Sequence, residues 1–323
     1  MVPTLIFSIL CFSFLLIKAA DLVIVALRRL SRLTKTGVFA LSAVILALGT
    51  SLPELFVAIT SAMEGTPVLS LGNVLGANIA NISLVAGIAG LFLGKVNINK
   101  DYIRRDVFMA LVAGLLPLIL ILDANLSRVD GLILLSVYGA YSASFFKSRF
   151  ERIAREHKKE TFFYRFFRKI ANIDGNYTRE IGRLFIGVAL LLFSADMIVK
   201  IASLLAAIAN IPVLFVGLVI LSIGTTLPEI AFSLRSVEEH QPTMFLGNLL
   251  GSIIANSLLI LGVASIISPI VITAFENYYE AVFAFILIFS IFWLFIKSKH
   301  RLDRWEAGLL LALYLIFVII EFA

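Results

Sequence analysis

This sequence contains few charged residues, few histidines and a single cysteine. Only 15% of its 323 residues are charged and 60% are hydrophobic, whereas soluble domains carry roughly 25% charged residues. The lone Cys11 cannot form an intrachain disulfide, so we interpret it as a packing residue. The three histidines, His157, His240 and His300, fall in predicted connections and are interpreted as solvated surface. The composition excludes an ordinary soluble domain and indicates a polytopic membrane protein.

Apolar runs of about 20 residues, long enough to cross a bilayer, recur along the whole chain. They predict ten membrane-spanning helices, at residues 2–26, 37–62, 68–93, 104–122, 130–146, 181–206, 212–236, 242–268, 277–296 and 304–322. The first run lacks a basic n-region and an A-x-A cleavage site, so we expect a retained span rather than a signal peptide. The sequence therefore predicts an all-α, multi-pass integral membrane protein.

Lys and Arg are concentrated in alternate connections between these spans. The connections that begin with the first hold 24 of the 27 basic residues, and the opposite set holds only Arg128. Because cytoplasmic loops carry the excess of Lys and Arg, we expect both termini on the extracytoplasmic side. The basic excess is thus a topology signal and no nucleic-acid-binding motif accompanies it, although residues 147–183 could also contact anionic lipid headgroups.

One acidic motif occurs twice at a fixed offset of 175 residues. The segment GTSLPE ends at Glu54, and the segment GTTLPE ends at Glu229. The same register, without a gap, relates Asp21 to Asp196, Asn73 to Asn248, Gly76 to Gly251 and Asn81 to Asn256. Chance would not keep so many polar residues and glycines in one register, so the sequence predicts an internal duplication.

Each half of the chain contains five predicted spans, which is an odd number, so the second half enters the membrane from the opposite side. We therefore expect two inverted five-helix repeats, residues 1–146 and 181–323, joined by a basic cytoplasmic loop at 147–180. Transporters built in this way place interrupted helices at the midplane. A proline directly before each glutamate removes an amide donor, so we expect the helix to be kinked or unwound near Gly49 and Gly224.

The repeated polar residues form a candidate metal site that offers only oxygen ligands. A carboxylate in hydrocarbon is costly unless it has a partner, so Glu54 and Glu229 are the leading candidates. The other predicted ligands are the hydroxyl or amide side chains of Thr50, Ser51, Thr225, Thr226, Asn81 and Asn256. Hard cations prefer such a set, and two carboxylates match the charge of one Ca2+. Because no Cys or His lies near these motifs, zinc and copper are disfavoured.

Two pairs of repeated polar residues have a second interpretation. Asn73 and Asn248 either contribute amide oxygens to the site or only hydrogen-bond between helices, and we favour the packing role. Asp21 and Asp196 lie toward the ends of their spans, where they either reach interfacial water or line an ion entrance.

At these residues the chain resembles the calcium/cation antiporter superfamily, and the sequence of its motifs is closer to that of the sodium/calcium exchanger branch. The resemblance implies that Glu54 and Glu229 are paired ion-binding glutamates, with Thr50, Ser51, Thr225, Thr226 and Asn81 as further oxygen donors. It also implies that Ser252 helps to bind sodium. The repeat mate of Ser252 is Ala77, which has no hydroxyl, and Asn256 replaces a residue that is acidic in some relatives. The missing hydroxyl at Ala77 predicts that one sodium site is missing, and Asn256 leaves only two strong acids in the site.

The predicted function is secondary active antiport of Ca2+ by alternating access, with the first and sixth spans as the gating pair that the resemblance implies. Two adjacent glutamates cannot both stay ionised without a cation, so protons become an available return load, and we favour H+ over Na+ as the counter-ion. A passive divalent-cation channel is an alternative use of the same glutamates. An intramembrane hydrolase would need an aspartate pair in a protease-like motif, which is lacking here, so we expect no enzyme. The expected partners are Ca2+, a monovalent ion and the bilayer, with no cofactor and no obligatory protein partner.

Overall fold

The structure is a computed structural model that describes residues 2–33, 51–93, 95–97, 106–154, 175–238, 242–299 and 301–322. Most of the second predicted span, including the candidate ligand Thr50, lies outside these ranges. The central part of the predicted loop 147–180 lies outside them as well.

Helices occupy each predicted span wherever the structure describes it. The α-helices are α1 (Val2–Leu33), α3 (Leu52–Met63), α4 (Pro67–Ala80), α5 (Ala86–Leu93), α7 (Phe108–Leu120), α8 (Arg128–Ala154), α10 (Gly175–Ala209), α11 (Val213–Phe215), α12 (Ser222–Glu238), α13 (Pro242–Ile254), α14 (Leu261–Ile267), α15 (Phe275–Lys299) and α16 (Arg304–Glu321). A short 3-10 turn, η3 (Ile121–Asp123), follows α7. Among the described residues, 6 helices are long and apolar enough to cross a membrane by length and composition.

Three π-helical segments join α-helices into longer rods. They are η1 (Asn81–Val85) between α4 and α5, η4 (Val216–Leu221) between α11 and α12, and η5 (Ala255–Ile260) between α13 and α14. Such wide turns are rare and are frequent at functional sites. The candidate ligands Asn81 and Asn256 lie at the first and second residues of η1 and η5, so the long helices change their hydrogen-bond register at these two asparagines.

The predicted unwinding at Gly224 is wrong. Helix α12 runs without interruption through Gly224 and Pro228, and the irregular turn is η4, which ends before Ser222. Pro228 removes the amide donor for the Gly224 carbonyl, and the helix continues past this loss. Two hydroxyls bond to other carbonyls one turn back: Thr226 Oγ1 donates to the Ser222 carbonyl at 2.6 Å, and Ser222 Oγ donates to the Leu218 carbonyl. The equivalent break at Gly49 falls outside the described residues.

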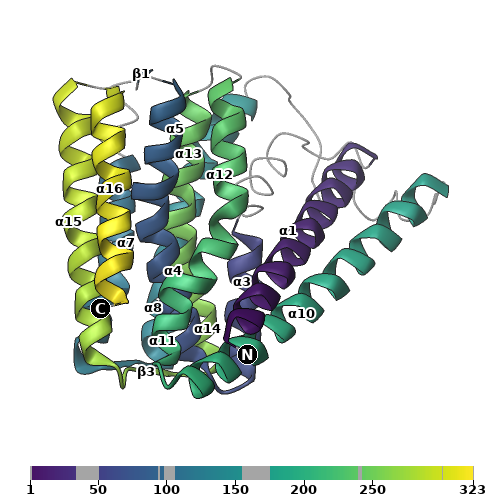
Figure 1. Ribbon diagram of the computed structural model, residues 1–323. Helices are drawn as coiled ribbons and strands as arrows, with labels where there is room; N and C mark the ends of the chain where they lie inside the picture. Colours follow the sequence, from purple (N-terminus) through teal and green to yellow (C-terminus); the bar gives the residue numbers. More distant parts are fainter. Residues whose placement is uncertain are drawn as a thin grey trace.

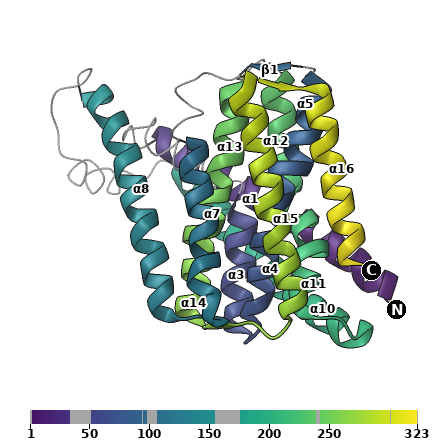
Figure 2. The same cartoon turned by 90° about the vertical axis from the view of Figure 1, so that its left-hand side faces the viewer.

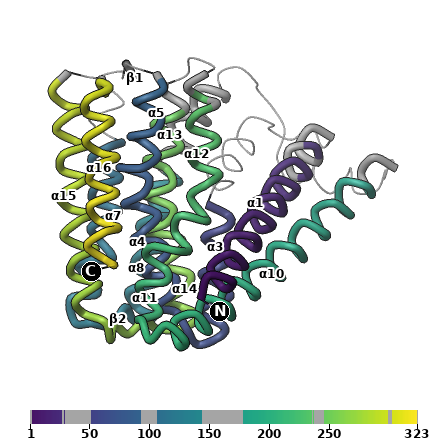
Figure 3. The backbone as a smooth tube through the Cα atoms, viewed as in Figure 1, coloured from purple at the N-terminus to yellow at the C-terminus, as the bar shows by residue number. Residues whose placement is uncertain are grey.

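Helices α1 and α10 form an antiparallel pair that leans against the remaining helices (Figure 1). Val2 and Ala209 line one cavity at one end of the pair, and Arg29 Nη1 lies 3.1 Å from Glu180 Oε1 at the other end. The tube in Figure 3 shows the same lean. The pair has its own hydrophobic cluster, centred on residues such as Leu16 and Ala195, and this cluster reaches α3, α4 and η4. A second and larger cluster holds the other helices together, and Figure 2 shows these helices side by side.

Two very short antiparallel sheets, which the all-α prediction did not include, connect the two halves of the chain. Strand β1 (Lys95–Asn97) pairs with β4 (Arg301–Asp303), and β2 (Asn125–Leu126) pairs with β3 (Ile270–Val271). Strand β1 lies at the top of Figure 1 and β3 at the bottom. The starts of β1 and β3 differ by 270 − 95 = 175 residues, and those of β2 and β4 by 301 − 125 = 176. Strand β1 of the first half thus corresponds to β3 of the second half, and β2 corresponds to β4. The β1–β4 sheet and the β2–β3 sheet are therefore equivalent when the two halves are exchanged.

Candidate cation-binding site

The two glutamates of the repeated motif are buried in the interior of the protein. Glu54 lies in the first turn of α3, directly after Pro53, and Glu229 lies in α12, directly after Pro228. Both side chains are 0% exposed, and they are close enough for their charges to interact. The structure thus brings together two carboxylates that are 175 residues apart in the chain.

Glycines allow the helices that carry these residues to approach closely. A Cβ added at Gly72 or Gly76 of α4 would lie 2.3 Å from the Leu214 carbonyl or 2.1 Å from the Leu218 carbonyl, and neither distance is sterically possible. Gly217 of η4 faces α4 in the same way, with 2.5 Å to the Leu69 carbonyl. Small residues at four-residue spacing, Gly72 and Gly76, thus bring the backbones of α4 and the segment 214–218 together.

Threonine hydroxyls of α12 lie between the two halves. Thr225 is fully buried beside Glu54, and its Oγ1 donates to Asn73 Oδ1 on α4 at 3.1 Å. Asn73 thus has a packing role between helices, as predicted. Thr226 is also fully buried, but its hydroxyl donates to its own helix backbone. Of the equivalent pair in the first half, Ser51 is buried at the N-terminus of α3, and Thr50 is not described.

A chain of three polar side chains connects the halves a second time. Asn78 Nδ2 on α4 donates to Ser257 Oγ on η5 at 2.8 Å, and Asn256 Nδ2 donates to Asn78 Oδ1 at 3.2 Å. The exposed fractions of these three side chains do not exceed 2%. Sequence reasoning missed Asn78 and Ser257, because their repeat mates are Ile253 and Ile82 and a search for repeated residues passes over them. The available signal was a polar residue within an apolar span.

Several buried oxygen atoms of the site have no hydrogen-bond donor among the described residues. They are Glu54 Oε1 and Oε2, Glu229 Oε1 and Oε2, Asn81 Oδ1, Asn256 Oδ1 and Ser51 Oγ. Buried carboxylates without partners cost several kcal/mol each. Natural interiors leave few polar groups unsatisfied, and each exception needs an explanation such as an ion. Carboxylate, amide and hydroxyl oxygens are the ligands that hard cations prefer.

The remaining predicted residues occupy different environments. Ser252 is buried on α13 beside Glu229, and its repeat mate Ala77 is buried on α4 with 0% exposure. Asp196 is partly exposed and pairs with Lys200 at 2.8 Å, and Asp21 is exposed. Within the described part of the chain, the carboxylate oxygens of Asp21 and Asp196 are not among the buried atoms that lack a hydrogen-bond partner.

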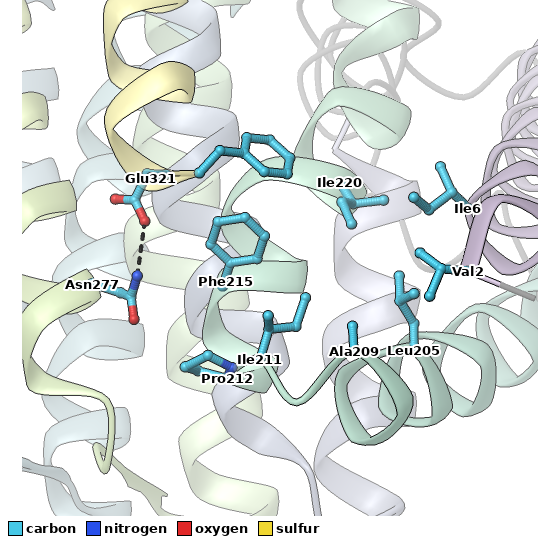
Figure 4. Close-up of a pocket in the computed structure, with 11 residues that line it drawn as sticks. Val2, Ile6, Leu205, Ala209, Ile211, Pro212, Phe215, Ile220, Asn277 and Glu321 are labelled. Atoms are coloured by element: carbon cyan, nitrogen blue, oxygen red, sulfur yellow. Dashed lines mark hydrogen bonds between the residues drawn. The ribbon is translucent and has the colours of Figure 1, made fainter.

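A separate apolar cavity of about 290 Å3 lies between the ends of the α1–α10 pair and the other helices. Figure 4 shows Val2, Ile6, Leu205 and Ala209 on one side and Asn277 with Glu321 on the other. None of the predicted ligands lines this cavity. The cavity marks incomplete packing between the pair and the remaining helices.

Comparisons with known proteins agree on one family. The family described as sodium/calcium exchanger protein matches residues 4–147 and 180–323. The sodium/calcium exchanger MaX1 of Methanosarcina acetivorans is 25% identical over 335 residues, with 95% of each chain covered. The inner membrane protein YrbG of Escherichia coli is 27% identical over 257 residues, with 79% of this chain and 77% of that protein covered.

Solved structures of the sodium-calcium exchanger NCX_Mj have a similar fold. One of those soaked with sodium and strontium, at 2.5 mM Na+ and 10 mM Sr2+, is 25% identical to this chain and has a TM-score of 0.62, with 99% of both chains covered.

Proposed function

Since this chain belongs to the sodium/calcium exchanger protein family, we propose that it is a secondary active antiporter that moves Ca2+ across the membrane in exchange for protons. One observation carries the proposal: the carboxylates of Glu54 and Glu229 are buried together, and none of their four oxygens has a hydrogen-bond partner in the described residues. Two negative charges in such an environment call for a divalent cation or for protons.

Ca2+ is the substrate that best fits the oxygen donors of this site. Within the described residues, no group of three or more His, Cys, Asp or Glu side chains is placed to hold a metal ion. The site offers only two carboxylates, and its other oxygens are neutral amides and hydroxyls. Because Ca2+ affinity depends on the number of charged ligands, this set suits an ion that is bound and released in transport. Two of the proteins named above, MaX1 and NCX_Mj, are named as sodium/calcium exchangers, which supports Ca2+ as cargo.

The two glutamates also provide the coupling between Ca2+ and the counter-ion. When Ca2+ leaves, two bare carboxylates in a low-dielectric interior repel each other and are poorly solvated. A return step without a cation is therefore unfavourable, and protonation of a glutamate removes the penalty. Exchange is coupled because only the loaded and the neutralised forms reorient readily.

Proton coupling is supported by what the site lacks. Ala77 provides no hydroxyl at the position that matches Ser252, and Asn256 provides an amide rather than a third carboxylate. Na+ is the second candidate counter-ion, because Ser252 lies beside Glu229 and both MaX1 and NCX_Mj are named as sodium/calcium exchangers.

The proposed architecture has ten spans in two inverted repeats, residues 1–146 and 181–323, joined by the loop 147–180. Two observations support it. Helices α1 and α10, which are repeat mates, run antiparallel, and the two small sheets at opposite ends exchange when the halves are exchanged. The Lys and Arg bias supports extracytoplasmic termini.

The α1–α10 pair is the proposed gate. It has its own hydrophobic cluster, and a cavity lies between one of its ends and the other helices. Because the same cluster includes Val57 of α3 and Leu69 of α4, we expect the pair to shift as a unit across these apolar side chains, while the helices that carry Glu54 and Glu229 keep their contacts with each other. Such a rigid-body movement around a central site is the usual form of alternating access.

Flux into proteoliposomes tests the function directly. Radioactive Ca2+ uptake would be compared with an outward proton gradient, an outward sodium gradient and no gradient, at clamped membrane potential. Proton-driven uptake is the expected result, whereas uptake driven by sodium alone would assign Na+ as the counter-ion. Ca2+ uptake that needs no counter-ion on the opposite side would identify a passive channel instead.

A further inference from the structure

Asn78 connects two residues of the second repeat although it belongs to the first. Its Oδ1 accepts a hydrogen bond from Asn256 Nδ2 at 3.2 Å, and its Nδ2 donates to Ser257 Oγ at 2.8 Å. An amide side chain has one acceptor end and one donor end. With both ends engaged, Asn78 is fixed in orientation, and it therefore fixes Asn256.

The orientation of Asn256 decides what it offers to a cation. Its Nδ2 points toward Asn78, so its Oδ1 points elsewhere, and this oxygen is buried without a donor among the described residues. A reversed amide would present two N–H groups in place of this oxygen, and N–H groups repel a cation. We infer that Asn78 is a positioning residue that holds Asn256 with its oxygen available to Ca2+ and thereby sets the affinity of the site for Ca2+.

The first repeat lacks this arrangement. The repeat mate of Asn78 is Ile253, and the mate of Ser257 is Ile82, so Asn81, the mate of Asn256, has neither equivalent partner. Ile253 and Ile82 are both buried with 0% exposure. Aliphatic side chains therefore fill the two equivalent positions in the other repeat. Helix packing at these positions does not need the polar side chains of Asn78 and Ser257. The inference rests on the proposed function, because it assigns a role to Asn256 as a ligand.

Asn78→Leu tests the inference, because it removes both hydrogen bonds and keeps the number and branching of the side-chain heavy atoms. The full-length chain in proteoliposomes should show a rise of about 10-fold in the Ca2+ concentration for half-maximal uptake, the lower end of what loss of a ligand-orienting partner costs. Uptake at saturating Ca2+ should stay within about 2-fold, since Glu54 and Glu229 are unchanged. Ile253→Leu is the matched control at the mate position and should change neither value.

Ser257→Ala provides an independent test. It removes one of the two bonds that fix Asn78 and leaves the Asn256 bond in place, so a smaller rise in the half-saturating Ca2+ concentration is expected. If Asn78→Leu does not give a monodisperse protein, Asn78→Ser and Ser257→Ala replace it. A half-saturating concentration that stays at the wild-type value in these variants overturns the inference.

A double-mutant cycle with Asn256→Ala separates a positioning role from a general one. If Asn78 acts through Asn256, adding Asn78→Leu to Asn256→Ala should cause no further rise in the half-saturating Ca2+ concentration. A full additional rise would show that Asn78 acts by another route and would overturn the inference.

The failure of the inference and that of the proposed function give different results. If the wild type exchanges Ca2+, Glu54→Gln abolishes exchange and Asn256→Ala leaves the half-saturating concentration unchanged, the antiporter stands and the role of Asn78 is wrong. If the wild type takes up no Ca2+ under any gradient, both are wrong.

Discussion

The α1–α10 pair buries mainly apolar side chains, whereas the helices around Glu54 and Glu229 bury polar and charged side chains as well. In the most apolar 18-residue stretch of α1, 39% of the residues are buried, and in that of α10, 33% are buried. In the corresponding stretch of the span that contains α4, 83% are buried. The buried contacts of the pair are formed by apolar residues, both small ones such as Ala19 and Ala195 and larger ones such as Leu16 and Leu205. The other helices bury amides, hydroxyls and carboxylates as well as a large apolar cluster.

This difference has a physical meaning. Polar groups in a low-dielectric interior are expensive and need defined partners, so helices that carry them are held in one arrangement. Apolar side chains pack without directional bonds, so a helix pair can shift across them at lower cost. The difference supports the proposal that one region binds the ion and the other moves.

Removing either carboxylate should produce the largest effect. Glu54→Gln and Glu229→Gln keep the side-chain volume but remove one of the two charges that balance Ca2+, so uptake should fall at least about 100-fold, since ligand charge sets Ca2+ affinity. The measurement is gradient-driven uptake of radioactive Ca2+ in proteoliposomes.

Glu321→Gln is the matched control for these changes. Glu321 is a buried carboxylate with 7% exposure that accepts a hydrogen bond from Asn277 at 3.2 Å, away from the predicted ligands. Its substitution should leave uptake close to wild type. Full uptake in both Glu54→Gln and Glu229→Gln would remove the basis for the proposed site.

Cross-links distinguish the moving pair from the fixed helices. A Cβ added at Gly224 of α12 would lie 3.0 Å from Ser13 Cβ of α1, and one at Gly187 of α10 would lie 2.7 Å from Val23 Cγ2 of α1. With Cys11→Ala as background, Ser13→Cys with Gly224→Cys should reduce uptake at least about 10-fold when oxidised, and reduction should restore it. Val23→Cys with Gly187→Cys links α1 only to α10. Oxidation of this variant should change uptake by less than about 2-fold, because a gate that moves as a rigid body needs no movement between α1 and α10.

Each cysteine variant in its reduced form serves as the reference for its oxidised form. Equal uptake before and after oxidation of the Ser13→Cys and Gly224→Cys protein would show that α1 does not move relative to α12. Loss of uptake on oxidation of the Val23→Cys and Gly187→Cys protein would show that α1 and α10 do not move as a unit.

The sequence predicts the long helices and the buried glutamates because both leave patterns over many residues. Apolar runs of about 20 residues identify helices, and the offset of 175 residues identifies Glu54 with Glu229. The strand pairs are too short to produce any periodicity, and they form only where the two halves meet. Asn78 was missed because a repeat search finds only residues that both halves keep.

The geometry near Gly224 was mispredicted for a different reason. Proline rules describe the loss of one backbone bond, but helix α12 continues past that loss, and the irregular turn lies earlier in the chain, at η4. Where a helix places its irregular turn depends on its neighbours. Here Gly72 and Gly76 of α4 pack directly against the π-helical region, a contact that sequence spacing alone does not reveal.

Gly76→Ala should have an intermediate effect, on stability rather than on chemistry. Its Cβ would lie 2.1 Å from the Leu218 carbonyl, so α4 and η4 must separate. Overpacking of this kind costs about 1–3 kcal/mol, and the thermal unfolding midpoint in detergent should fall accordingly. Gly139→Ala on α8 is the control, because a Cβ there meets no atom within 4 Å and alanine favours a helix. Equal midpoints for the two variants would contradict the close packing of α4 on η4.

Asp196→Asn should have the smallest effect and decides between the two interpretations of the repeated aspartates. Asp196 and Lys200 form a partly exposed i,i+4 ion pair on α10, and exposed pairs of this kind contribute little to stability. If Asp196 only reaches interfacial water, Ca2+ uptake should be unchanged at both low and high ionic strength. If it lines an ion entrance, uptake should fall at low ionic strength alone, because attraction of a cation by a surface charge is screened by salt. Comparing uptake rates at two salt concentrations therefore shows whether the α1–α10 pair only gates the path of Ca2+ or also forms part of it.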